Sequence, residues 1–499
     1  MTTIGTQTAP AVTAPSATAD KTPPPSDNLI RRKTQMLVDD GNLKASEETS
    51  EYHGSPEKLT RAGNTLTLET SDKSDVIHIS QDPNGQLQVT VNGQEYTFNG
   101  NKRSPNNPSS EGVPPQFRLH IKSGAGNDNI TLAPDVTVDV KIEAGDGDDT
   151  VQTEGGNPDI YGGRGNDTIR LGKGGGYVEG NDGDDTIIGG SGPSVMYGNK
   201  GNDRLYAGAG PTSKKSHLDG GEGEDQLYAG DGHTVINGGD GNDQIVAHAN
   251  TTVYTGKGSD TVWGNLTKAR IYAQNNDYLP GTEQSNITRM EPSEAGKKAF
   301  KIVGSDEFKQ RVEDDLALLR SSPVGRKMLE EMDKAAERNG APVTIGETKS
   351  GSSSYTFNSS ELQKLSKQER EEIPQDAPRM GGIKDGEPGA RADQGIIDYM
   401  RSMIVSIGDE DITSPIVALY HEMAHAWNGA NGTFLAGTSD DPTSPDLANG
   451  EPQAVGLSTN APPFDFDNDP TTPPTSTNPA PFTENALREE MGLSPRLKY

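Results

Sequence analysis

The segment His421-Glu422-Met423-Ala424-His425 contains the residues whose types and spacing could most clearly do chemistry. On an α-helix, residues four apart lie on one face, so the two imidazoles can reach a single metal ion. Glu422 would lie at the flank of that metal, where a carboxylate can take a proton from an attacking water and deliver it to a leaving amine. The segment therefore predicts a metal-dependent hydrolytic centre of the HExxH type.

A third ligand is expected to be a carboxylate, because every other histidine lies at or before residue 248. We favour Glu451, which lies 26 residues beyond His425 and close to the apolar residues AVGL, so that it can begin a second helix beside the first. Glu484, early in TENALREEMG, is the alternative. Two histidines, one carboxylate and an open position are typical of catalytic zinc, so we expect one zinc ion. Less favoured carboxylates in a Pro- and Ser-rich loop are Asp440, Asp441 and Asp446.

The helix that must carry both histidines is predicted from its capping residues. Ser414 is a candidate N-cap, Pro415 suits the first helical position, and Gly429 is a candidate C-cap after the apolar run IVALY. Two alternatives remain open: a pair of histidines without metal on an ordinary helix, and a metal-dependent hydrolase that does not cleave peptides. Helical spacing over 305–340, with Gly340 as a candidate C-cap, and the short strands APVTIGE and SSYTF complete an α+β domain.

A second group of residues with chemical meaning lies between residues 124 and 262, where the unit G/N-x-G-x-D-x-(I/V/L) appears eight times. Consecutive aspartates are 21, 18, 18, 18, 22, 18 and 17 residues apart, and eighteen is twice nine. In a coil with two strands per turn these units would stack along one edge. Glycine carbonyls and aspartate carboxylates suit Ca²⁺, which prefers oxygen ligands. The predicted Ca²⁺ ligands are Asp128, Asp149, Asp167, Asp185, Asp203, Asp225, Asp243 and Asp260.

This unit resembles the RTX nonapeptide repeat, and the resemblance implies a parallel β-roll, or β-helix, with several Ca²⁺ ions in its turns. Only every second nonapeptide keeps the full glycine and aspartate set, so Ca²⁺ is expected on one edge only. Residues 124–262 carry 9 Lys or Arg against 23 Asp or Glu, a density of charge that would repel without cations. The alternative is a metal-free β-helix in which Asp and Asn satisfy the turn backbone.

Composition excludes several classes of protein. A net charge of −29 argues against binding to nucleic acid or to an anionic membrane. The absence of Cys excludes disulfides, thiolate nucleophiles and iron–sulfur clusters. The sequence shows neither an apolar run long enough for a membrane span nor a conventional secretory signal peptide.

The fold class expected from these patterns is multidomain. A disordered leader rich in Thr, Ala, Pro and Ser occupies 1–62, because such a composition cannot repay the entropy of ordering. A β domain with the β-roll follows over 63–272, opening with period-two strands and a hairpin signal at Asn92-Gly93. A linker over 273–302 leads to a metallopeptidase domain over 303–499. We expect the repeats and this domain to work as separate modules.

The motifs HEMAHAWNG, EPQAVGL and TENALREEMGL together resemble the zinc endopeptidases among bacterial type III effectors, typified by NleD-like and HopH-like proteins. The resemblance covers residues 305–499 and implies a zincin-like fold with a gluzincin-like metal site. It also implies secretion, delivery into host cells and a host signalling protein as substrate, and the leader resembles an effector export region. Pro452 follows the proposed ligand, so Glu451 is expected at a helix start.

The C-terminal residues Arg496 and Tyr499 resemble an Arg and Tyr pair with which clostridial neurotoxin zinc proteases stabilise an oxyanion. The alternative is a solvated tail. The expected function is therefore hydrolysis of peptide bonds by a secreted zinc endopeptidase with a calcium-binding repeat domain. The rival is a calcium-ordered secreted binding or surface protein whose C-terminal domain does not catalyse. The sequence leaves the substrate, export route and oligomeric state open.

Overall fold

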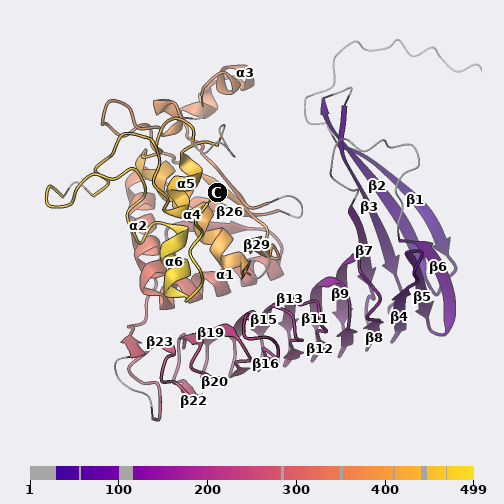
Figure 1. Cartoon of the computed structure of the whole chain (residues 1–499). Coiled ribbons are helices and arrows are strands. Elements are labelled where there is room, and N and C mark those ends of the chain that lie inside the picture. Colours follow the sequence, from indigo (N-terminus) through magenta and orange to yellow (C-terminus); the bar gives the residue numbers. More distant parts are fainter. Residues whose placement is uncertain are drawn as a thin grey trace, which may run out of the picture.

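The chain forms a long β-solenoid followed by a mixed α/β region that lies on one of its faces (Figure 1). This confirms the expected order of a β-roll and an α+β domain. In the figure the α/β region stands over the strands β13 to β23. The computed structural model describes residues 30–55, 58–100, 116–281, 286–348, 352–374, 376–407, 411–439, 447–467 and 469–498.

Residues 118–289 form the parallel solenoid, which has about nine turns. Each turn gives one strand to a first sheet, which has 13 strands among the described residues, and one to a second sheet, which has 11. The solenoid strands of the first sheet are β7 (Gln116–Lys122), β9 (Asp139–Asp146), β11 (Asn157–Arg164), β13 (Gly176–Asp182), β15 (Ser194–Lys200), β17 (Lys215–Glu222), β19 (His233–Asp240), β21 (Thr251–Tyr254), β23 (Arg270–Ala273) and β24 (Ile287–Arg289). Those of the second sheet are β8 (Asn129–Leu132), β10 (Thr150–Thr153), β12 (Thr168–Arg170), β14 (Thr186–Ile188), β16 (Arg204–Tyr206), β18 (Gln226–Tyr228), β20 (Gln244–Ala247) and β22 (Thr261–Gly264).

The 18-residue step creates the core, because it stacks one apolar side chain per turn in each sheet. Ile160 pairs with Val178 in the first sheet and Ile169 with Ile187 in the second, and all four are fully buried. Where successive coils approach closely, the residue in the turn must be glycine. A Cβ on Gly183, whose φ is 142°, would lie 2.0 Å from the carbonyl oxygen of the preceding turn.

The N-terminal part differs from the expected leader. Residues 1–29 lie outside the described residues, but from Ile30 onward the chain forms β1 (Ile30–Asp39) and β2 (Lys44–Ser55). These extend the first sheet through β3 (Lys58–Glu69), which pairs with β7. The apolar residues Leu43 and Leu66 are buried there, which offsets the polar composition. The second sheet is extended by β4 (Val76–Gln81), β5 (Gln86–Val91) and β6 (Gln94–Asn99), with the predicted Asn92-Gly93 turn between the last two.

The expected linker over 273–302 also differs, because it contains ordered strands. β24 pairs with β23 through Ile287 and Ile271 and so continues the solenoid to Arg289. β25 (Phe300–Val303) already belongs to the following sheet. The α/β region therefore follows the solenoid after a short connection.

The α/β region has a four-stranded sheet in the order β25, β26 (Val343–Glu347), β28 (Ile396–Tyr399), β27 (Ser354–Thr356). Ser322 separates its first two helices, and Gly340 ends the second with a φ of 80°, as predicted. A small pair of strands, β29 (Val405–Ile407) and β30 (Asp411–Thr413), precedes the central helix. The helices are α1 (Asp306–Ser321), α2 (Pro323–Asn339), α3 (Lys367–Glu371), α4 (Pro415–Asn431), α5 (Gly450–Val455) and α6 (Glu484–Glu490).

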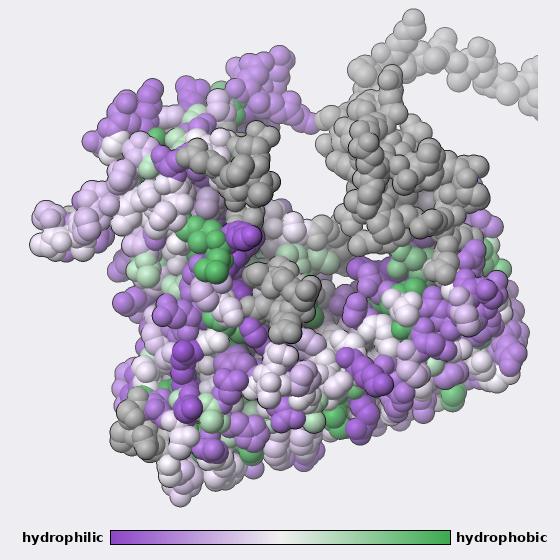
Figure 2. Space-filling view, in the orientation of Figure 1, coloured by the Kyte–Doolittle hydropathy of each residue, from purple (hydrophilic) through white to green (hydrophobic). Residues whose placement is uncertain are grey.

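The two parts share one hydrophobic cluster, which differs from the expectation of separate modules. Val235 and Tyr254 of the solenoid belong to the same buried cluster as residues of α1, α2, α4 and α6. The outer surface in this view is mostly hydrophilic (Figure 2), in keeping with a mean hydropathy of −0.76. Among the helices of the described residues, none has the length and apolar character needed to cross a membrane.

Candidate active site

Helix α4 carries the two histidines and is almost completely buried. It begins at Pro415 after Ser414, as predicted, but it ends at Gly432 and not at Gly429. Gly429 lies inside the helix, where its missing side chain leaves room for the ring of Tyr355 in β27: a Cβ there would lie 2.2 Å from the Tyr355 hydroxyl oxygen.

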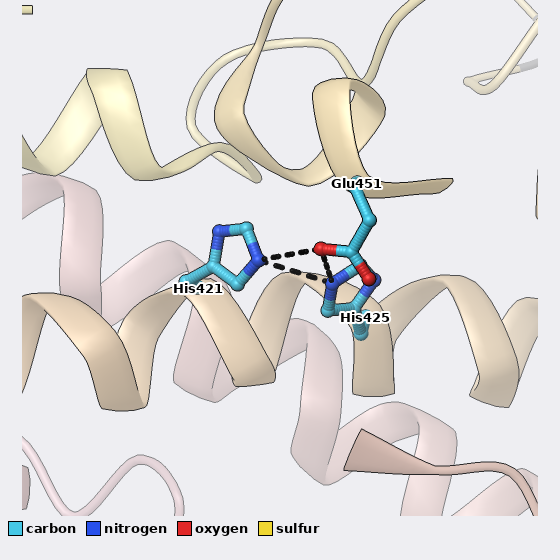
Figure 3. A group of neighbouring side chains, drawn as sticks. All are labelled: His421, His425 and Glu451. Atoms are coloured by element: carbon cyan, nitrogen blue, oxygen red, sulfur yellow. Dashed lines mark hydrogen bonds and ion pairs between the residues drawn. The ribbon is translucent and has the colours of Figure 1, made fainter. Parts of the chain in front are cut away.

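The structure brings His421, His425 and Glu451 together (Figure 3). The two histidine Nε2 atoms are 3.1 Å apart, and each lies 3.3 Å from Oε2 of Glu451. Both imidazoles rise from α4 and face the carboxylate of α5 (Figure 3). Their candidate ligand atoms all lie within 4.8 Å of one another, so these three residues could hold one metal ion.

A buried amide network holds α5, and with it Glu451, against α4. Asn428, one turn beyond the second histidine, exchanges two hydrogen bonds of 2.9 Å with the side chain of Asn478. Gln453, two residues after Glu451, donates to Asn478 Oδ1 at 2.8 Å. All three amide side chains are fully or almost fully buried. Sequence reasoning missed this network, because Asn478 is 50 residues from its partner in a Pro- and Thr-rich segment.

Glu484 lies on the opposite side of His421 from the three-residue cluster. Its Oε2 is 3.0 Å from Nδ1 of His421, whereas Nε2 faces Glu451. A carboxylate on the second nitrogen of a metal-binding histidine fixes the orientation and tautomer of the ring. The position of Glu484 therefore does not support the alternative that it is the third ligand. Glu484 lies where it can orient the His421 ring, which the sequence did not indicate.

Arg496 is 3.3 Å from Oε2 of Glu484, behind His421. Burial alone would raise the pKa of Glu484, but His421, Arg496 and Arg488 outweigh it and lower the pKa below its usual value. The contact favours a supporting part for Arg496, and oxyanion stabilisation by this residue stays a prediction. Tyr499, its predicted partner, lies outside the described residues, as do Asp440, Asp441 and Asp446.

Glu422 lies on a cleft with a cavity volume of about 800 Å³, which His425 and Glu451 also line. The side chain is 7% exposed, and burial raises its pKa, opposed by the neighbouring histidines. A raised pKa brings a carboxyl closer to the range in which it exchanges protons near neutrality. The backbone N–H of Tyr355 in β27 faces this carboxylate and also opposes the rise in its pKa.

The electrostatics of the cluster favour a cation. Burial disfavours a charged His421, but the bonds to Glu451 and Glu484 outweigh this and raise its pKa to about 10. Carboxylates therefore surround the histidine pair from both sides. Nitrogen and carboxylate donors that converge at an open cleft match the donor set of a catalytic transition-metal site.

The eight predicted aspartates form one ladder along a single edge of the solenoid. The Oδ1 atom of each accepts the backbone N–H of the preceding rung, as at 2.7 Å between Asp167 N and Asp185 Oδ1. All eight are buried, and the Oδ2 atom of each has no hydrogen-bond partner among the described residues. A Cβ on Gly162 would lie 2.2 Å from Oδ2 of Asp167 and 2.7 Å from the carbonyl oxygen of Gly180, so these oxygens converge. Carboxylate oxygens that lack a hydrogen-bond partner among the described residues, with carbonyl oxygens beside them, suit Ca²⁺.

Two further aspartates close the ladder at its ends, and sequence reasoning missed both. Asp128 accepts the N–H of Asp75, and Asp277 accepts the N–H of Asp260. Unlike the eight, these two have protein donors on both carboxylate oxygens. Asn92 donates to Oδ1 of Asp75 and Ser71 to Oδ2, and Thr255 donates to Oδ2 of Asp277. The glycine motif is absent around both, so only the spacing of 17 residues to Asp277 could have indicated that rung.

Two parts of the chain match models of known families. Residues 296–499 match the Peptidase_M91 family, described as an effector protein. Residues 141–177, 179–211 and 217–245 match the RTX calcium-binding nonapeptide repeat. A search of curated proteins gave no match, and a search of solved structures gave none. The predicted resemblance, an effector peptidase domain fused to RTX repeats, is confirmed.

Proposed function

From an effector-type peptidase domain joined to calcium-binding repeats, we propose that the chain is a secreted zinc endopeptidase that hydrolyses peptide bonds of a host protein after delivery into the host cell. One observation carries the proposal: His421, His425 and Glu451 converge beside Glu422, at a cleft that Glu422, His425 and Glu451 line. The donor set favours zinc over Ca²⁺ or Mg²⁺, because imidazole nitrogens make up two of the three ligands.

His421, His425 and Glu451 would hold the ion, and a bound zinc would supply Lewis-acid polarisation of the scissile carbonyl. Glu422 takes the proton of the attacking water and then gives it to the leaving amine. Burial suits this carboxylate for both steps, since it raises the affinity for the proton. Glu484 keeps Nδ1 of His421 engaged, so that Nε2 stays directed at the cluster.

The cleft suits an extended polypeptide. β27 is the edge strand of its sheet and lines the cleft, so its free edge can pair with a substrate segment. Phe357 and Phe434 line the same cleft and offer apolar contacts to substrate side chains. The proposed export region lies within the leader upstream of Ile30, and the proposed peptidase domain follows the solenoid from residue 296 to the end.

In the repeats, the eight ladder aspartates are proposed as Ca²⁺ ligands, with Asp75 and Asp277 as end rungs that need no ion. The orphaned Oδ2 atoms support this division, since a buried carboxylate oxygen without a partner is costly.

The test is cleavage mapping of a host-cell proteome with purified full-length protein against Glu422→Gln, with the zinc content of both measured. We expect one zinc per chain in each, new peptide termini with wild type, and loss of cleavage by several orders of magnitude in the variant. Near wild-type cleavage by Glu422→Gln would end the assignment of this residue as the proton carrier. Calcium binding without zinc or cleavage would favour the rival, a calcium-ordered binding protein.

A further inference from the structure

Helix α6 touches both the solenoid and the histidine of the candidate metal centre. At its start, Glu484 is bonded to Nδ1 of His421. Just past its end, the carbonyl oxygen of Met491 accepts from Thr252 Oγ1 at 2.9 Å and from His233 Nε2 at 2.8 Å. The helix has only seven residues, so a displacement of its C-terminal end would also move Glu484 at its N-terminal end.

The last residue of α6 is fastened on two sides. Oε1 of Glu490 accepts from the hydroxyl of Tyr254 in β21 at 2.9 Å, and Oε2 accepts from the backbone N of Val324 in α2 at 2.8 Å. Gly492, whose φ is 76°, is pressed against the solenoid: a Cβ there would lie 2.8 Å from Cε1 of His233. The end of α6 therefore depends on strands β19 and β21 for its place.

A second contact, through α1, makes this docking specific. The guanidinium of Arg311 lies 3.2 Å from the centre of the Tyr197 ring, and its Nε donates to the Tyr177 hydroxyl at 3.2 Å. Asn199 of the solenoid donates to Asp314 at 2.8 Å. Arg311 is completely buried, and a buried charge of this kind is costly unless all its partners stay in place. The α/β region is thus held to the solenoid at two separate places.

The strands that hold α6 lead directly into rungs of the aspartate ladder. β19 is followed by Asp243 and β21 by Asp260, and the Oδ2 atoms of both lack hydrogen-bond partners in the part of the chain that the structure describes. Without a cation, these buried carboxyl groups must either take up protons or repel one another, and either cost opposes the turns that end these two strands. Ion binding at these turns therefore stabilises the part of the solenoid on which α6 rests.

We propose that the solenoid is a working part of the peptidase centre: β19 and β21 hold α6, α6 places the positioning residue Glu484 on His421, and calcium loading of the repeats thereby raises the affinity of the centre for zinc. The inference rests on the proposed function for both ion sites and goes beyond it by making one depend on the other. Because binding free energies are reciprocal, zinc raises the calcium affinity by the same factor.

The test is a zinc titration of the full-length protein against a chromogenic zinc competitor, after metals have been removed on a chelating resin, at calcium concentrations from none to 10 mM. We expect zinc affinity to rise about tenfold or more with calcium, as when a ligand's orienting partner is restored. The rise should follow the calcium-dependent circular dichroism signal of the solenoid. Equal zinc affinity at every calcium concentration overturns this inference alone. No zinc binding under any condition overturns the proposed function beneath it.

Two pairs of substitutions distinguish an effect on the position of α6 from an effect on folding of the solenoid. Thr252→Val with Tyr254→Phe removes the two hydroxyl contacts to the end of α6 and leaves the ladder intact. The matched control, Thr186→Val with Tyr228→Phe, makes the same changes in the second sheet. We expect only the first pair to lower zinc affinity in calcium and to alter the visible spectrum of the cobalt-substituted protein, with calcium-dependent folding retained in both. Unchanged cobalt spectra and zinc affinity in the first pair would overturn the path through α6.

Discussion

At the scale of single residues, the two carboxylates near His421 are expected to behave differently when changed. Glu451→Gln removes a ligand charge and should lower zinc affinity strongly, because two histidines alone hold the metal weakly. Glu484→Gln keeps all three ligands but weakens the bond to Nδ1, so a loss of about 10–100-fold in metal affinity is expected. Zinc titration of both variants checks the order, and a larger loss for Glu484→Gln would make it the better candidate for the third ligand.

The sequence could predict those site residues that lie close together along the chain. His421, Glu422 and His425 lie within one and a half helical turns, so the helical repeat alone indicates their geometry. Glu451 could be predicted as a ligand because no histidine follows His425 in the sequence, so that the third ligand is expected to be a carboxylate. The bond between Glu484 and His421 spans 63 residues, and no local pattern encodes which carboxylate closes such a loop.

At the scale of elements, the ladder predicts an unusual pH dependence for the calcium-free solenoid. Burial raises the pKa of Asp167 and Asp185 to about 8 and that of Asp203 to about 9, from a usual value of 3.8. Between pH 3.8 and about 8 to 9, the folded solenoid therefore binds more protons than the unfolded chain. The stability that these groups contribute is greatest at low pH and is lost as the pH rises through the folded pKa values of about 8 to 9.

Calcium should reverse this trend, because protons compete with the ion for the same oxygens. Thermal unfolding followed by circular dichroism from pH 5 to pH 8.5, with and without calcium, measures both slopes. A calcium-free solenoid whose Tm rises with pH over this range would contradict the assignment of raised pKa values to the ladder.

At the opposite edge of the solenoid, the ammonium group of a buried lysine contacts the turns. Nζ of Lys214 donates to the carbonyl oxygens of Gly190, Ala207 and Gly208, and the side chain is 2% exposed. Lys214 lies in the 22-residue step, so the longer loop delivers this ammonium to the turns.

Lys214→Met keeps the apolar stem and removes the donor of three buried or partly buried hydrogen bonds. The expected loss is about 1–3 kcal/mol in the free energy of unfolding, measured by denaturant titration in calcium. Lys173→Met, an exposed lysine on the same edge, is the control and should leave stability nearly unchanged. Equal stability of both variants would contradict the structural part given to Lys214.

The pattern of elements was largely predictable because it is periodic. The 18-residue step predicts stacked coils, and capping residues such as Ser414 and Gly340 mark helix ends. The predictions failed where tertiary packing replaced local preference. Gly429 is a glycine for packing against the Tyr355 ring and not for ending the helix. Strands β1 and β2 form because they pair along the edge of an adjacent sheet.

At the scale of the whole molecule, the shared core predicts that the peptidase domain is weakened by removal of the solenoid. A fragment of residues 296–499 would expose the side chains that pack on Val235 and Tyr254, and would expose the buried Arg311. We expect it to unfold at a lower temperature than the same domain in the full chain and to bind a hydrophobic dye. A fragment with an unchanged Tm would show that the domain is complete without the solenoid, as the sequence alone suggested.

Anomalous X-ray scattering at the zinc edge, from crystals of the full-length protein grown with calcium and zinc, would locate the metal of the peptidase centre. We expect one strong peak about 2.0–2.2 Å from Nε2 of His421, Nε2 of His425 and a carboxylate oxygen of Glu451. Nδ1 of His421 should remain bonded to Glu484. No zinc peak among these side chains, or a peak ligated by other residues, would contradict the assignment of this cluster as the catalytic metal centre.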